Sequence, residues 1–61
     1  MAKGKILIVE DEKNIRELVR YNVTREGYRV LLAKDGEEGL TLASQERPDL
    51  VLLDVMMPGM D

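Results

Sequence analysis

Three short apolar runs along the chain have the character of β-strands. Residues 5–10 and 49–54 have no polar residue between their ends, so we expect both strands to be buried on both faces of a sheet. Residues 28–33 are also rich in β-forming side chains, but they carry Arg29 among apolar neighbours. A charged residue in a strand favours an edge of the sheet, so the second strand is predicted to lie there.

Two helices are predicted between these strands. In residues 12–26 the apolar positions recur at spacings of three and four, which indicates a helix with one buried stripe. The stripe consists of Ile15, Leu18, Val19 and Val23. Gly27 follows, where a helix commonly ends in a left-handed residue. Residues 36–46 predict a shorter helix that buries Leu40 and Ala43.

The second helix has signals at both ends. Asp35 followed by Glu38 resembles a capping box, in which the Asp35 side chain accepts from the Glu38 amide. Pro48 disfavours helix at the residue before it and so ends the segment. Gly36 and Gly39 each cost up to about 1 kcal/mol of helix stability relative to Ala.

Strands that alternate with helices predict an α/β fold. Helical crossovers connect parallel strands, so the three strands should form one parallel sheet. If the first strand lies between the other two, the strand order is 2-1-3, and the first and third strands end at the same edge. The predicted architecture is therefore a βαβαβ unit with a helix between each pair of successive strands.

Acidic residues stand at the ends of the first and third strands. Glu10 and Asp11 complete the first, and Asp54 completes the third. If the strands are parallel neighbours, these carboxylates are within reach of one cation, and Mg²⁺ prefers such oxygen ligands. The ion could polarise an incoming phosphoryl group while an Asp54 oxygen attacks the phosphorus. Taken separately, each acidic site is more typical of a helix cap or a turn, so the prediction depends on their meeting.

Composition excludes several classes of function. The 61 residues carry a net charge of −3 and include two Tyr but no Phe or Trp, so direct binding of nucleic acid is not expected. No apolar run approaches a membrane span and no secretory signal is present, which favours a cytoplasmic protein. The chain has no Cys and no His, so neither disulfides nor a structural zinc can reinforce this small fold. Oligomerisation is the remaining source of stability.

Two segments carry a family resemblance. Residues 5–12, with the pair Glu10-Asp11, and residues 52–61, with Asp54 and Pro58-Gly59, resemble the receiver domain of bacterial two-component response regulators. The Glu-Asp form of the first pair is most similar to the winged-helix transcription-factor branch. The resemblance implies a flavodoxin-like receiver fold that acts as a phosphoacceptor and not as an enzyme. It also implies that Asp54 receives the phosphoryl group from a sensor histidine kinase, and that Glu10, Asp11, Asp54 and the backbone carbonyl of Met56 hold Mg²⁺, with Glu10 acting through water.

A complete receiver is longer, so the resemblance implies that residues 1–61 form its N-terminal half. The family binds the phosphoryl oxygens with a Ser or Thr and a Lys on later strands, and no such residue follows Asp54. We therefore expect Mg²⁺ binding to be weak or absent and phosphorylation to be slow or absent. The third strand would have an open edge, and we expect a homodimer or a complementary fragment to cover it.

Two further readings remain open. The chain could be a structural or engineered half-flavodoxin fragment that folds by homodimerisation and does not signal. It could also be another acidic-site α/β protein. A phosphohydrolase of the haloacid dehalogenase type needs a second Asp two residues after its nucleophile, where Met56 stands, and a P-loop needs glycines where Glu10 and Asp11 stand.

Overall fold

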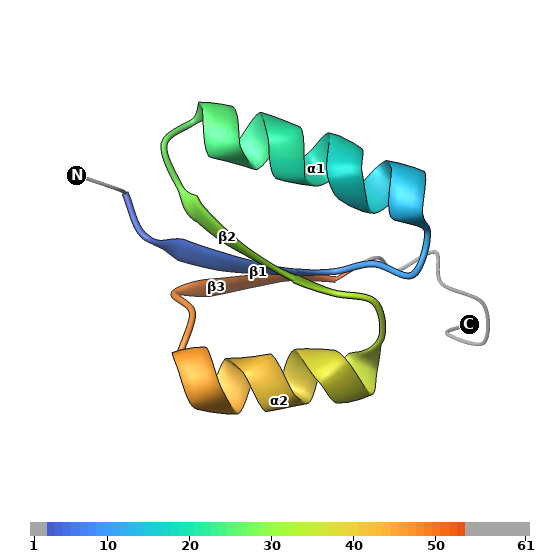
Figure 1. The fold of residues 1–61 in the computed structure, drawn as a ribbon. Coiled ribbons are helices and arrows are strands. Elements are labelled where there is room, and N and C mark those ends of the chain that lie inside the picture. The colour runs from blue at the N-terminus through green and yellow to red at the C-terminus, as the bar shows by residue number, and fades with distance from the viewer. Residues whose placement is uncertain (1–2, 54–61) are drawn as a thin grey trace.

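A three-stranded parallel sheet with one helix on each face forms the fold (Figure 1). The computed structural model describes residues 3–53. In chain order the elements are β1 (Lys5–Val9), α1 (Lys13–Arg25), β2 (Arg29–Ala33), α2 (Gly36–Glu46) and β3 (Leu50–Leu53). The strand order is β2-β1-β3, so the predicted α/β arrangement is confirmed, including the edge position of the strand that carries Arg29.

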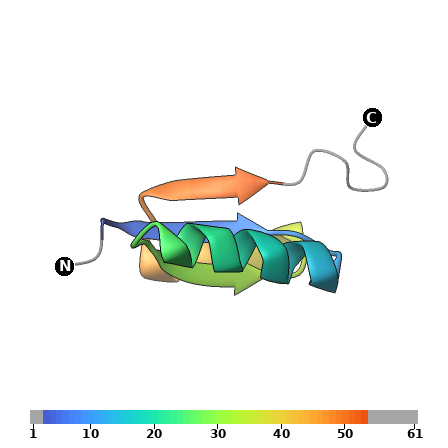
Figure 2. The ribbon, with the colours of Figure 1, turned by 90° about the horizontal axis from the view of Figure 1, so that it is seen from above.

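The register of the sheet brings all three strand ends to one edge. Val9, the last residue of β1, pairs with Ala33 of β2 on one side and with Leu53 of β3 on the other. Figure 2 shows the three strands pointing the same way. The last residues of the three strands therefore lie at one common edge of the sheet, which we call the carboxyl edge.

The core lies along β1. Ile6, Leu7, Ile8 and Val9 are all buried, as expected for a strand with a helix on each face. Leu7 and Val9 form a cluster with Ala33 on the side of α2, and Leu31, Leu42 and Ala43 pack against it. Full burial of an aliphatic side chain contributes about 1.5–3 kcal/mol, so this strand supplies a large share of the apolar stabilisation.

Both helices begin at capped residues. At α1 the Glu12 side chain accepts from the Asn14 amide at 3.1 Å, so the helix starts one residue later than predicted. At α2 the capping signal is confirmed, because the Glu38 amide donates to Asp35 Oδ1 at 2.8 Å. Glu38 Oε1 in turn accepts from the Lys34 amide at 2.9 Å.

In the part of the chain that the structure describes, no helix is long and apolar enough to cross a bilayer.

Both helix ends also follow the expected chemistry. Gly27 has a φ of 96°, the left-handed conformation predicted after the first helix. Arg47 takes the same region at the end of α2, with a φ of 48°. Pro48 follows directly, so the helix cannot continue.

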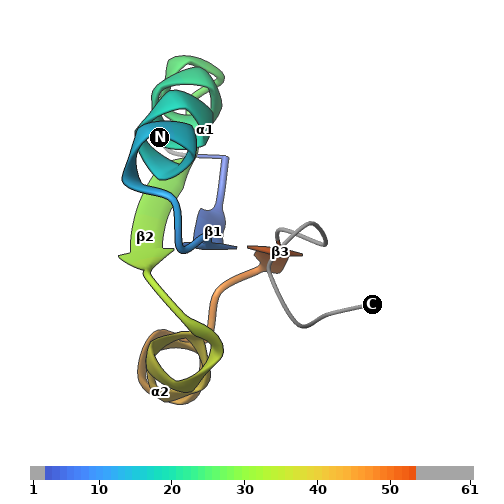
Figure 3. The same cartoon turned by 90° about the vertical axis from the view of Figure 1, so that its right-hand side faces the viewer.

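Part of the predicted buried stripe on each helix is exposed. Ile15 and Leu18 on α1 and Leu40 on α2 were expected in the core, but their exposed fractions are 47%, 61% and 75%. The helices contact the sheet through β1 and β2 and not through β3 (Figure 3). Ile15 and Leu40 lie on the helix sides that face β3, where no third layer covers them within residues 3–53.

The expectation that the third strand is buried on both faces is also wrong for the described residues. Leu50, Val51 and Leu53 are all exposed, and Leu53 reaches 60%. β3 has one partner strand, β1, in this sheet. Its apolar sequence fits a covered strand, but among residues 3–53 neither helix extends over it.

Gly39 sets the distance between α2 and β1. It is buried, and a Cβ at this position would lie 2.8 Å from Cγ2 of Val9. Val9 is itself a stiff, buried residue of the core, so it cannot easily move aside. Gly39 is thus a packing requirement, whereas Gly36 has nothing within 4 Å of its Cβ position.

This difference predicts opposite effects of two alanine substitutions. Gly39→Ala should lower the free energy of unfolding by about 1–2 kcal/mol, since overpacking outweighs the gain in helix propensity. Gly36→Ala should leave it unchanged or raise it by up to about 1 kcal/mol. Urea unfolding followed by circular dichroism measures both, and equal effects would contradict the packing role of Gly39.

Candidate functional site

The candidate site is the start of the loop between β1 and α1, at the carboxyl edge. Glu10 follows Val9 directly and is almost fully buried, with 3% of its surface exposed. Asp11 and Glu12 come next and are exposed. The structure thus brings the predicted residues Glu10 and Asp11 to the edge where β3 also ends.

Glu10 is held by its backbone and its side chain together. Its amide donates to the carbonyl of Ala33 at 3.0 Å, which extends the pairing of β1 with β2 by one residue. Its Oε2 accepts from the Glu12 amide at 3.0 Å. A buried carboxylate is costly unless hydrogen-bonded, and this bond compensates part of that cost while it folds the loop back on itself.

Arg16 makes a further contact with this loop that the sequence pattern did not single out. Its Nη1 donates to the carbonyl oxygen of Glu10 at 2.8 Å, and the side chain is half-buried. The sequence feature that could have indicated this contact is the position of Arg16, a cation in the first turns of a helix that follows three consecutive acidic residues. No short motif encodes it, because the acceptor is a main-chain atom.

The donors present fit a hard cation in chemistry. Glu10 and Asp11 supply carboxylate oxygens, the ligand type that Mg²⁺ prefers. Within residues 3–53 no group of three or more His, Cys, Asp or Glu side chains could hold a metal. The other predicted ligands, Asp54 and the carbonyl of Met56, lie outside the described residues.

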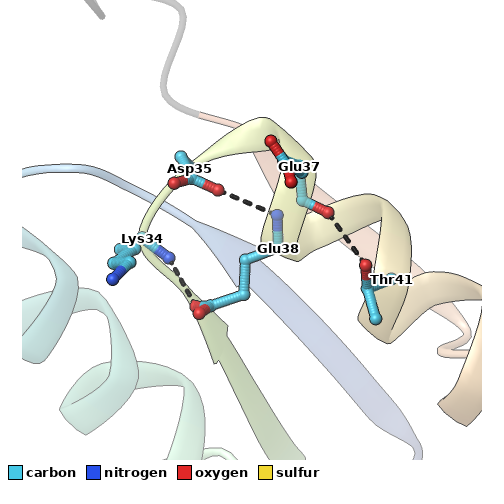
Figure 4. Close-up of a pocket in the computed structure, with 5 residues that line it drawn as sticks. All are labelled: Lys34, Asp35, Glu37, Glu38 and Thr41. Carbon is cyan, nitrogen blue, oxygen red and sulfur yellow. Dashed lines mark hydrogen bonds between the residues drawn. The ribbon is translucent and has the colours of Figure 1, made fainter.

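An acidic hollow at the N-terminus of α2 is explained by the capping of that helix. Lys34, Asp35, Glu37, Glu38 and Thr41 line a volume of about 320 Å³ (Figure 4). Asp35 and Glu38 accept the two capping hydrogen bonds, and Thr41 Oγ1 donates to the carbonyl of Glu37 at 3.2 Å. These polar groups serve the helix, so we assign no ligand to the hollow.

Two apolar grooves flank β3, one on each face of the sheet. The α1 groove, of about 200 Å³, is lined by Ile8, Val9, Glu10, Ile15, Val19, Leu52 and Leu53. The α2 groove, of about 340 Å³, is lined by Leu7, Val9, Gly36, Gly39, Leu40, Ala43, Val51 and Leu53. The exposed residues of β3 and of the two helix sides therefore form one apolar surface around a strand edge.

Comparison with known proteins agrees with the two sequence motifs. Residues 6–61 match the response regulator receiver domain. The chain is 54% identical over 57 residues, 93% of its length, to the alkaline phosphatase synthesis transcriptional regulatory protein PhoP of Bacillus subtilis. It is 51% identical over 60 residues, 98% of its length, to the probable transcriptional regulator ycf27 of Guillardia theta.

A third relative has a similar name. The chain is 48% identical over 56 residues, 92% of its length, to the transcriptional regulatory protein AfsQ1 of Streptomyces coelicolor. These matches cover 24%, 24% and 25% of the three relatives, so the chain spans about a quarter of their length. The family resemblance seen in residues 5–12 and 52–61 is confirmed.

Proposed function

Because the chain belongs to the response regulator receiver domain family, we propose that it is a phosphoacceptor module of two-component signalling in which Asp54 receives a phosphoryl group. The observation that supports this most is the pairing of Val9 with Leu53 in parallel strands. Glu10 and Asp54 are the next residues of the two strands in sequence. An acidic pair and an acidic nucleophile are thus expected at one edge.

The proposed reaction is transfer from a histidine of a sensor kinase. The P–N bond of the phosphohistidine breaks as an Asp54 oxygen forms a bond to phosphorus, and the imidazole keeps the electron pair of the broken bond. The product on this chain is an acyl phosphate. The kinase supplies the phosphoryl group, so the chain itself is a substrate and not an independent enzyme.

Mg²⁺ is the proposed cofactor, and it neutralises negative charge around the transferred group when bound. Asp11, Asp54 and the carbonyl of Met56 would hold it directly. Glu10 would act through water, since its carboxylate is buried and Oε2 already accepts from the Glu12 amide.

The output of the module is proposed to be transcriptional, since the three relatives are named as transcriptional regulators. With a net charge of −3, this chain is not proposed to contact nucleic acid itself. Its proposed partner is a sensor histidine kinase, and its proposed location is the cytoplasm.

One observation favours a second candidate function, self-association without signalling. β3 has a single partner strand within residues 3–53, and apolar grooves flank it on both faces. An open apolar strand edge recruits another strand. Two copies of β3 could meet around a twofold axis and cover both pairs of grooves.

Phosphorylation provides the direct test of the first candidate. Prolonged incubation with acetyl phosphate and Mg²⁺ should slowly add the mass of one phosphoryl group, measured on the intact protein, if the phosphoacceptor chemistry operates without the later strands of the family. Asp54→Asn should abolish the addition, and so should removal of Mg²⁺ with a chelator. Modification that persists in Asp54→Asn would contradict the assignment of the nucleophile.

Metal binding tests the acidic pair separately. Asp11→Asn should weaken Mg²⁺ binding by at least about tenfold in a calorimetric or NMR titration, because a ligand oxygen and its charge are lost. Glu26→Gln removes the same charge at the far end of α1 and should leave the affinity unchanged. Equal losses in both variants would indicate a general charge effect instead of a site.

Self-association predicts dimers of the 61-residue chain at micromolar concentration in light scattering. Val51→Lys, in the α2 groove, should shift the population toward monomer, because a lysine on an edge strand opposes pairing. Leu18→Lys is the matched control. Leu18 is at least as exposed as Val51 but lies outside both grooves, so this change should leave the share of dimer unchanged. A wild-type monomer at every concentration would exclude this candidate.

A further inference from the structure

We propose that Arg16 is the positioning residue of the acidic loop, residues 10–12, and that it fixes Asp11 in place for a divalent cation. The inference rests on the proposed function, since that function supplies the cation. It concerns a residue that neither the motifs nor the donor set includes. Three observations carry it: the hydrogen bond from the Arg16 side chain to the Glu10 carbonyl, the hydrogen bonds that hold the peptide groups on either side of Asp11, and the position of Arg16 in α1.

The Arg16 side chain holds the loop at one point, where its guanidinium donates to the carbonyl of Glu10 at 2.8 Å. The Arg16 amide donates to the carbonyl of Glu12 at 2.9 Å, which is the first backbone hydrogen bond of α1 and does not depend on the side chain. Asp11 is the one residue between these two acceptors. A third bond, from the Glu12 amide to Glu10 Oε2, closes the loop across Asp11. The peptide group before Asp11 is thereby anchored to Arg16 on α1, and the peptide group after Asp11 is anchored to the Glu10 side chain.

The position of Arg16 is unfavourable for the helix itself. The first turn of α1 has no acidic residue, and a cation near a helix N-terminus opposes the helix dipole. The guanidinium also forms no ion pair with a carboxylate among residues 3–53, where both ion pairs involve other cations. Its observed partner is the Glu10 carbonyl, so the contact ties the first turn of α1 to the loop that precedes it.

A charge role and a positioning role of Arg16 predict opposite changes in Mg²⁺ affinity when Arg16 is replaced by Gln. A guanidinium beside an acidic site repels Mg²⁺, so if Arg16 acted only through its charge, Arg16→Gln would bind Mg²⁺ more tightly. If Arg16 acts by holding the loop, the same change would bind Mg²⁺ more weakly. The direction of the change in affinity therefore separates the two roles.

The test titrates Mg²⁺ into the wild-type protein and its variants, followed by NMR at the Asp11 amide. Arg16→Gln should weaken Mg²⁺ binding about tenfold, the usual effect of losing a group that orients a ligand. Arg16→Lys keeps the charge but loses the planar fork, so it should weaken binding by a smaller factor, about threefold. Arg20→Gln is the matched control, because Arg20 pairs with Glu17 on the same helix, and it should match the wild type.

Two further measurements exclude a merely structural effect. In Arg16→Gln the Mg²⁺ concentration for half-maximal phosphorylation by acetyl phosphate should rise, while the rate at saturating Mg²⁺ should stay close to the wild-type rate. Loss of folded protein would instead lower the amplitude at every concentration. Hydrogen exchange at the Glu12 amide should also be faster in Arg16→Gln without any metal.

The outcomes that overturn the proposal are distinct from failure of the proposed function. If the wild type binds Mg²⁺ and Arg16→Gln binds it equally or more tightly, the positioning role is wrong and the phosphoacceptor role stands. If the wild type neither binds Mg²⁺ nor becomes phosphorylated, the proposed function fails and this inference fails with it. If Arg16→Gln does not fold, Arg16→Lys decides, and an affinity equal to that of the wild type overturns the positioning role.

Discussion

Parallel pairing of β1 with both neighbouring strands is the constraint on which the rest of the structure depends. Leu7 and Val9 are buried because α2 lies over their face of a strand that is itself central. The same pairing aligns Val9 with Ala33 and Leu53, so every strand ends at one edge. An acidic residue directly after β1 therefore lies at the carboxyl edge, independent of the sequence of the loop that follows.

Features set by local or pairwise chemistry were predictable from sequence. The Asp35 cap and the left-handed Gly27 follow from residues within a few positions of one another, and the parallel direction of the strands follows from the helical crossovers. The exposure of Leu18 and Leu40 was not predictable, because an apolar stripe tells which face of a helix is apolar but not which layer covers it. That information resides in contacts distant along the chain.

The candidate site divides in the same way. The acids Glu10 and Asp11 were found because acids after buried apolar runs are visible in sequence and parallel topology brings strand ends together. Arg16 and Gly39 were not found, since each acts through a contact that exists only in the folded chain. The Arg16 guanidinium contacts a peptide carbonyl, and the helix backbone at Gly39 packs against Val9. The type of a side chain alone does not predict such contacts.

Two opposing energies act on metal binding when a cation stands beside the acidic loop. A guanidinium about 4 Å from the metal would repel a unit charge by about 1 kcal/mol in bulk water and by about 4 kcal/mol near a protein surface, and about twice as much for a divalent ion. Ordering a free backbone costs about 1–2 kcal/mol per residue, so ordering residues 10–12 only when the metal arrives would cost about 3–6 kcal/mol. The bond from the Arg16 guanidinium to the Glu10 carbonyl imposes part of that order in advance, together with the bonds of the Glu10 amide and of Glu10 Oε2, so the gain from ordering and the repulsion are of similar size.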